Sequence, residues 1–231
     1  MNEVLRQEKK LLITLDQMYQ ISANVEKFLM PDPHNFADGY LIRSLYFDTI
    51  DERDYMEKEE GVEIRRKIRL RTYGPDYSFG VLEMKQKQGP MQKKRSLKLS
   101  KQDSEQLIKG NYSVLLNYNE PFAAECYAYM NLHAYLPKSI VEYRRKAYIA
   151  KENKIRITFD HHIVATESNF NLFDAKLQQN PVLNPQLCVL EVKYNGFLLS
   201  YIKDLLWDVN KSETSVSKYS LSRSTTMHYN F

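Results

Sequence analysis

The feature that most constrains this chain is the basic run RRKIRLR at residues 65–71. Alternate side chains of a β-strand share a face, so Ile68 and Leu70 point one way. The cations on the other face, spaced about 6.6 Å apart, are Arg65, Lys67, Arg69 and Arg71. Because like charges repel, such a row favours a strand that faces a bound anion. The alternative is an ordinary solvated face of an antiparallel sheet.

The same arrangement recurs on most of the predicted strands. Glu83, Lys85 and Lys87 share one face of their strand, with Leu82 and Met84 on the other. Further charged residues that lie opposite or beside apolar positions are Arg6, Glu8, Lys10, Lys93, Arg95, Arg145, Arg156, Glu191 and Lys193. The repetition argues against a single solvated strand.

Alternation and β-branched or aromatic content predict eight strands, over residues 6–14, 40–47, 63–73, 77–88, 93–99, 139–150, 154–162 and 187–194. Helices are expected over residues 16–29, with Asp16 as cap, and over 50–60, 101–109, 121–134 and 199–208. Strands predominate without strict βαβ order, which indicates an α+β fold around an antiparallel sheet. Closure into an eight-stranded β-barrel, with helices packed outside, would remove exposed edges. With no linker composition, one domain is expected over residues 1–231.

The net charge of +4, from 33 basic and 29 acidic residues, is too small for a general nucleic-acid binder. A flat basic sheet that binds nucleic acid usually also exposes aromatic residues for base stacking. Cations inside a barrel would instead meet a compact, highly charged anion, which Arg binds pairwise and Lys as a point charge. Oligophosphate fits this best, and no nucleic-acid partner is expected.

Other signals restrict the function by their absence. No apolar run approaches the ~20 residues of a membrane helix, and residues 1–10 are too polar for a signal peptide, so a cytoplasmic location is expected. Neither GxxxxGK[ST] nor GxGxxG occurs. Cys126 and Cys188 lie far apart without a metal-binding spacing and are expected in the core.

Carboxylates within the basic faces need a separate explanation. Glu8, Glu83 and Glu191 could pair with neighbouring Arg and Lys side chains. Alternatively, they could hold Mg²⁺ or Mn²⁺, hard cations that bridge carboxylate and phosphate oxygens. The residues alone leave both interpretations open.

An ordered set of motifs resembles the VTC domain, the polyphosphate polymerase domain of the vacuolar transporter chaperone. The matching segments are R-x-E-x-K at residues 6–10, RSLYFDT at 43–49, G-x-x-x-R-x-K-x-R-x-R-x-Y at 61–73, LEMK at 82–85, K-x-R at 93–95, Y-x-R-x-A at 143–147, IRI at 155–157, LEVK at 190–193 and SKYS at 217–220. The resemblance implies the CYTH-like superfamily of triphosphate tunnel metalloenzymes, whose fold is an eight-stranded antiparallel tunnel.

The resemblance also implies roles for individual residues. Positions that match the family's phosphate-binding residues are Lys10, Arg69, Arg71, Lys85, Lys93, Arg145, Arg156 and Lys218. Glu191 matches the metal-binding glutamate, and a Mg²⁺ or Mn²⁺ cofactor is implied. Arg65, Lys67 and Arg95 are added because they share faces with residues of this set. Glu8 and Glu83 complete the candidate metal carboxylates.

One departure bears on the reaction. Hydrolytic members of the superfamily begin with E-x-E-x-K, whereas this chain has Arg6 at the first position. Losing that carboxylate should weaken water activation, which favours transfer of phosphate to phosphate. The expected activity is a polyphosphate polymerase that moves the γ-phosphate of ATP to a growing chain, oriented by Lys10, Arg69, Arg71, Lys85 and Arg156.

Two other functions stay open. The same tunnel could belong to an inorganic or nucleoside triphosphatase acting on tripolyphosphate, or to a non-catalytic polyphosphate-binding module. Eukaryotic relatives work beside membrane domains, so a membrane-protein partner is also open. The sequence specifies no oligomeric state.

Overall fold

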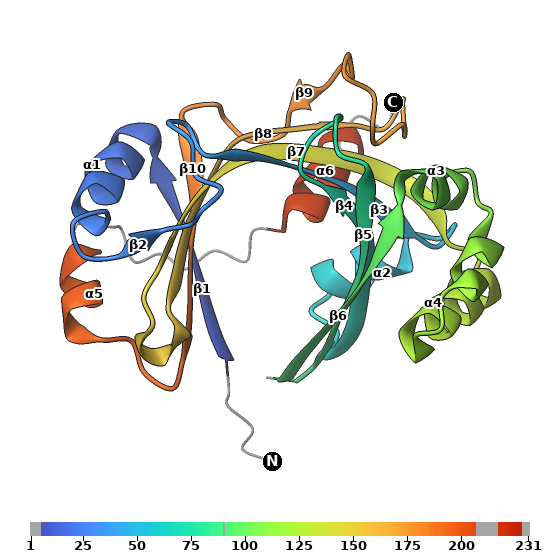
Figure 1. Ribbon diagram of the computed structural model, residues 1–231, viewed down its shortest axis with the longest axis horizontal. Coiled ribbons are helices and arrows are strands. Elements are labelled where there is room, and N and C mark those ends of the chain that lie inside the picture. Colours follow the sequence, from blue (N-terminus) through green and yellow to red (C-terminus); the bar gives the residue numbers. More distant parts are fainter. Residues whose placement is uncertain (1–5, 90, 207–216, 228–231) are drawn as a thin grey trace. The chain divides into compact units, whose positions relative to one another are not determined.

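The computed structural model describes residues 6–89, 91–206 and 217–227 and has an α+β fold (Figure 1). The strands are β1 (Arg6–Thr14), β2 (Met30–Pro31), β3 (Tyr40–Asp48), β4 (Ile64–Thr72), β5 (Phe79–Gln88), β6 (Met91–Ser100), β7 (Leu136–Ile149), β8 (Arg156–Thr166), β9 (Asn180–Pro181) and β10 (Leu187–Asn195). The α-helices are α1 (Leu15–Val25), α2 (Arg53–Glu59), α3 (Lys101–Ile108), α4 (Pro121–Leu132), α5 (Ser200–Leu205) and α6 (Lys218–Met227). The 3-10 helices are η1 (Tyr112–Asn117) and η2 (Glu152–Lys154).

The strands form a mostly antiparallel sheet of order β1-β10-β8-β7-β3-β4-β5-β6, with β2 paired to β7 and β9 paired to β8. All eight predicted strands are present, but β2 and β9 raise the count to ten, so the predicted number is wrong. The predicted closed barrel is also wrong, because the order ends at β1 and β6 without a pairing that joins them in the described residues. Both end strands carry several Lys or Arg residues, the charges with which natural edge strands prevent further pairing.

Helices α1 to α5 match the five predicted helices, with shorter bounds. Thr14, and not Asp16, caps α1: its hydroxyl accepts from the Gln17 N–H, and the Gln17 side chain accepts from the Thr14 N–H. Helix α6 and the 3-10 helices were not predicted, and residues 207–208 of the last predicted helix lie outside the described part. Among the described helices, none is both long enough and apolar enough to span a membrane.

The chain forms two compact units, each assembled from three segments. Unit 1 comprises Met1–Leu41, Tyr143–Ile163 and Pro181–Ser217. Unit 2 comprises Ile42–Glu142, Val164–Asn180 and Lys218–Phe231. Because neither unit is continuous in sequence, the single domain expected over residues 1–231 stays a prediction.

In unit 1, strands β1, β10 and β8 pack an apolar face against α1 and α5 (Figure 1). Leu190 of β10 is paired with Leu11 of β1 on one side and with Phe159 of β8 on the other. Val25 of α1 and Ile202 of α5 belong to the same buried cluster. The helices thus cover one face, and the alternate residues of these strands carry the charges.

In unit 2, strands β3 to β6 pack an apolar face against α3, η1 and α4 (Figure 1). Leu45, Leu70, Leu82 and Leu97 are register neighbours across the four strands, and all are buried in one cluster. Cys126 of α4 lies in this cluster, as predicted. This row of leucines fixes the opposite face for the charged residues.

Gly39 provides a test of how the backbone is packed in unit 1. It has φ +84°, and a Cβ at this position would lie 2.2 Å from the carbonyl oxygen of Arg145. We predict that Gly39→Ala lowers the free energy of unfolding by about 3 kcal/mol, because the backbone must shift in addition to adopting a left-handed conformation. Urea denaturation at neutral pH measures the loss.

Gly61 is the matched control. It has φ +73° but no atom within 4 Å of its Cβ position, so Gly61→Ala should cost only about 1 kcal/mol. Equal losses for the two variants would contradict the close contact at Gly39.

Candidate functional site

The predicted basic row of β4 is present in unit 2, on the face opposite the core. Ile68 and Leu70 are fully buried, whereas the four cations of the row are partly exposed. Arg66 lies on the other face, where its guanidinium is 3.6 Å from the centre of the Tyr129 ring. The structure therefore confirms that the four predicted cations share one face.

The register of β5 and β6 adds cations to this row. Lys85 pairs with Lys67, and Lys94 of β6 pairs with Lys85, so three lysines lie side by side. Like charges directly opposite one another destabilise a sheet. The cations that β4, β5 and β6 place on this face, called here the basic face, are Arg65, Lys67, Arg69, Arg71, Lys85, Lys87, Lys94 and Lys98.

Glu83 is the carboxylate of the basic face. It is 4% exposed, and one of its oxygens lies 2.7 Å from Arg69 Nε and 2.9 Å from an Arg71 guanidinium nitrogen. Its other oxygen contacts the Lys94 ammonium. Burial alone would raise the pKa of Glu83, but Arg69 and Lys94 hold that pKa below its ordinary value. This geometry supports the interpretation that Glu83 pairs with neighbouring Arg and Lys side chains over the interpretation that it holds a metal ion.

Lys93 and Arg95 do not belong to the basic face. Lys93 pairs with Gln86 and Arg95 with Met84, which puts both on the face opposite Lys85. Arg95 donates hydrogen bonds to Gln86 at 2.8 Å and to Glu125 of α4 at 2.6 Å. Lys93 and Arg95 therefore do not lie with the other predicted cations of unit 2, and alternation could have shown this, because they share a face with the core residues Leu97 and Leu99.

Helix α6 packs against the basic face through Tyr219 (Figure 1). The Tyr219 ring stacks on Tyr46 of β3 at 5.0 Å, and its hydroxyl donates to the buried Asp48 at 2.7 Å. The Lys67 ammonium lies 5.6 Å from the same ring. Lys218, a predicted phosphate-binding residue, is the first residue of this anchored helix.

Unit 1 contains a second charged group, in which Glu8 and Lys10 of β1 are paired with Lys193 and Glu191 of β10. The Lys10 ammonium is 3.0 Å from a Glu8 oxygen and 3.7 Å from a Glu191 oxygen. The Lys193 ammonium is 2.8 Å from Glu191 and 3.9 Å from Glu8. We call these four residues the acid–lysine cluster.

Glu191 is the most deeply placed carboxylate of this cluster, with its side chain 8% exposed. Burial alone would raise its pKa, but Lys193, Arg145 and Lys10 hold the pKa well below its ordinary value. Burial also lowers the pKa of Lys193. Glu191 is therefore ionised at neutral pH and can bind a cation.

Two predicted arginines of unit 1 are held by carboxylates that the sequence did not identify. Asp160 of β8, fully buried, accepts two hydrogen bonds from Arg145, at 2.6 and 2.7 Å. Asp32 accepts from Arg156 at 2.7 Å, and Arg156 also donates to the Tyr40 hydroxyl at 3.1 Å. Asp160 shares a face with Arg156 by strand alternation and could have been found; Asp32 lies outside the regular strands.

Carboxylate oxygens are the ligands that Mg²⁺ and Mn²⁺ prefer, so the fit of an ion can be tested on the acid–lysine cluster. Glu8 and Glu191 share both ammonium partners, and Glu191 is ionised, so this pair fits a site that phosphate and water oxygens complete. Three neighbouring His, Cys, Asp or Glu side chains are not found together in the described part of the chain. Glu83 fits less well, since both of its oxygens contact cations at hydrogen-bonding distance, whereas the Glu191 oxygen that faces Lys10 lies 3.7 Å from that ammonium.

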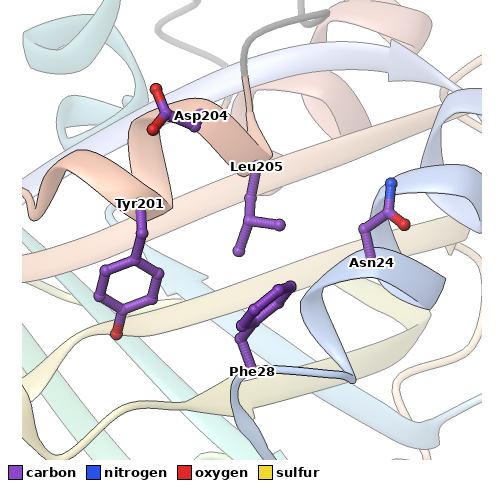
Figure 2. A pocket seen from close by; sticks show the side chains of 5 residues that line it. All are labelled: Asn24, Phe28, Tyr201, Asp204 and Leu205. Atoms are coloured by element: carbon purple, nitrogen blue, oxygen red, sulfur yellow. The ribbon is translucent and has the colours of Figure 1, made fainter.

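A separate hollow of about 320 Å³ lies in unit 1 between α1 and α5 (Figure 2). Its lining residues are Asn24, Phe28, Tyr201, Asp204 and Leu205. They include no Lys or Arg. This hollow therefore lacks the charges that would bind phosphate and differs from both charged groups.

Comparisons with known proteins agree with the sequence motifs. The profile of the VTC domain matches residues 5–227. Curated proteins give no match.

Solved structures show which folds the chain resembles. A structure from Bacillus halodurans, described as a candidate adenylate cyclase, is similar to this chain with a TM-score of 0.55 and 12% identity, over 94% of this chain and 96% of that chain. One from Vibrio parahaemolyticus, described in the same terms, has a TM-score of 0.50 and 13% identity, over 95% and 98%. At such identities the likeness shows the fold alone.

The charge pairing at Glu83 generates a prediction about stability. Glu83→Gln should lower the free energy of unfolding by about 3 kcal/mol at pH 7, because it leaves Arg69, Arg71 and Lys94 without their shared carboxylate. The lowered pKa means that this stabilisation is complete above the ordinary value of 4.5 and is lost as pH falls below it. Denaturant unfolding across pH 3–7 measures both effects.

The matched control is Glu125→Gln, which breaks the more exposed pair with Arg95. Its expected cost is below about 1 kcal/mol. Two results would contradict this stabilisation by Glu83. Glu83→Gln would lose no more stability than the control, or its unfolding would keep the acid dependence of the wild type.

Proposed function

Because the chain belongs to the VTC domain family, we propose that it is a metal-dependent phosphotransferase that adds the γ-phosphate of ATP to a growing polyphosphate chain. The observation that carries this proposal is the basic face of unit 2. Among the paired residues of β4, β5 and β6, its Arg and Lys side chains share their face with one carboxylate, Glu83. The excess positive charge suits a ligand with a negative charge on every repeating group.

Oligophosphate meets that requirement better than other anions do. Neighbouring cations are about 6.6 Å apart along a strand and about 4.8 Å apart across strands, so adjacent phosphates of one chain can each contact Arg or Lys. Arg binds phosphate oxygens pairwise and Lys binds them as a point charge. In this proposal, Arg65, Lys67 and Lys94 contact the chain, and Lys94 takes the role expected of Lys93 and Arg95.

The reaction needs no nucleophile from the protein. A terminal phosphate oxygen of the acceptor attacks the γ-phosphorus of ATP, the new P–O bond forms, and the β–γ bridging P–O bond breaks with its electron pair leaving on ADP. Fixed cations stabilise the charge that spreads over the transferred group. We assign this role to Arg69, Arg71 and Lys85 of the basic face; for Lys10, Arg145, Arg156 and Lys218, the phosphate contacts that the family resemblance implies stay predictions.

Glu191, together with Glu8, is proposed to hold Mg²⁺ or Mn²⁺. When bound, the ion would neutralise phosphate charge, as divalent cations do in phosphoryl transfer. The surrounding Lys10 and Lys193 would keep Glu191 ionised and in place. Glu83 is left out of the metal set because its three cationic partners contact both of its oxygens at hydrogen-bonding distance, whereas one Glu191 oxygen lies 3.7 Å from its ammonium partner.

The same residues would serve a triphosphatase if water replaced the phosphate acceptor. Glu8 and Glu191 retain a carboxylate pair beside cations, which is the observation that keeps this second candidate. Arg6, in place of a further carboxylate, favours transfer, although its side chain lies outside the described part of the structure. A module that only binds polyphosphate would use the basic face without the carboxylate pair.

An assay of the product separates these functions. Purified protein with ATP and Mn²⁺ or Mg²⁺ should convert γ-phosphate to polyphosphate, measured by gel electrophoresis and ³¹P NMR. Glu191→Gln and Arg69→Ala should each lower kcat about 100-fold or more. Glu125→Gln, on the other face of unit 2, is the control and should keep wild-type kcat.

The alternatives give different products in the same assay. Release of free phosphate from ATP or tripolyphosphate, without formation of polyphosphate chains, would show that the protein is a triphosphatase and not a polymerase. If the protein binds polyphosphate without any turnover, and Glu191→Gln does not change that binding, the protein is a non-catalytic polyphosphate-binding module.

A further inference from the structure

Two polar groups at the Arg71 end of the basic face are buried without a partner among the described residues. Ser44 of β3 is 0% exposed, and its hydroxyl makes no hydrogen bond within the described residues. Arg71 of β4 is its register neighbour, and the Arg71 Nε–H likewise has no acceptor among those residues. Because paired residues of adjacent strands share a face, both groups belong to the same side of the sheet.

The surrounding groups already have other partners. The far end of the Arg71 guanidinium is 2.9 Å from Glu83, and Glu83 also contacts Arg69 and Lys94. The Tyr46 hydroxyl, on the same face of β3, accepts from Arg69 at 3.3 Å. The Arg71 side chain is thus held at one end, while its Nε–H and the Ser44 hydroxyl remain unused donors.

Buried donors without acceptors are destabilising, and in folded proteins they are normally satisfied by an ordered water or by a ligand. A water molecule could accept from both groups here. An anionic oxygen would bind more strongly, since a hydrogen bond between a guanidinium and an anion is charge-assisted. The excess of cations on this face favours the anion over neutral water.

We propose that Ser44 is a further substrate-binding residue, whose hydroxyl acts with Arg71 Nε–H to bind one anionic oxygen of a phosphoryl group. This assignment rests on the proposed function and adds a specific contact to it. Ser44 donates its hydroxyl proton, Arg71 donates Nε–H, and the phosphoryl oxygen accepts both. Glu83 positions Arg71 for this contact.

The test is the affinity of Ser44→Ala for tripolyphosphate, measured by isothermal titration calorimetry with and without Mg²⁺. Loss of one hydrogen bond to an anion should raise Kd about tenfold. The thermal stability of the ligand-free variant should stay equal or rise slightly, because the substitution removes an unsatisfied buried hydroxyl.

Ser104→Ala is the matched control. Ser104 is also 0% exposed, but its hydroxyl donates to the Ser100 carbonyl oxygen at 2.7 Å in α3. This variant should lose thermal stability and keep the wild-type Kd, which is the reverse of the result expected for Ser44→Ala. An unchanged Kd for Ser44→Ala would overturn the proposal and leave an ordered water between the two donors.

A double-mutant cycle tests whether the two groups bind the same oxygen. Arg71→Lys keeps the charge and removes the Nε–H group, and its effect on Kd should be smaller in the Ser44→Ala background than in the wild type. Additive effects would contradict a shared oxygen.

The outcomes also separate this inference from the proposed function. If the wild type makes no polyphosphate but Ser44→Ala still weakens tripolyphosphate binding, the binding contact stands and the polymerase does not. If the wild type polymerises and Ser44→Ala binds normally, only the contact is rejected.

Discussion

Pairing of cations with two buried carboxylates is the interaction on which the rest of this structure depends. The cations that contact Glu83 in unit 2 are Arg69, Arg71 and Lys94, and those that contact Glu191 in unit 1 are Lys10, Arg145 and Lys193. Like charges on adjacent strands destabilise a sheet, and each carboxylate offsets part of that repulsion. On the basic face the charge that remains is strongly positive, and this excess attracts an oligophosphate.

Strand alternation makes the core and the charged face depend on each other. The row formed by Leu45, Leu70, Leu82 and Leu97 holds β3 to β6 in one register. A slip by one residue would expose these leucines and bury the cations, so the register is strongly specified. The apolar packing that stabilises unit 2 therefore also positions Arg69, Arg71 and Glu83 within contact distance.

Residues in regular, strictly alternating strands could be predicted from the sequence, and the remainder depends on tertiary contacts. The β4 row was predictable because Ile68 and Leu70 alternate with its cations. The face of Lys93 and Arg95 was predictable in the same way, because alternation puts both on the side of Leu97 and Leu99, which lie in the core. Helix α6 has a polar sequence without apolar periodicity, and Tyr219 anchors it through distant Tyr46 and Asp48, which no local pattern indicates.

The most direct test of the central claim is calorimetric titration of the wild-type protein with tripolyphosphate at physiological salt, followed by competition with single-stranded RNA of equal phosphate content. Salt weakens binding of both polyanions, so the competition is more informative than either salt dependence alone. We predict that one tripolyphosphate binds per chain and that RNA does not displace it. Absence of tripolyphosphate binding, or its displacement by RNA, would contradict the claim that the basic face is built for oligophosphate.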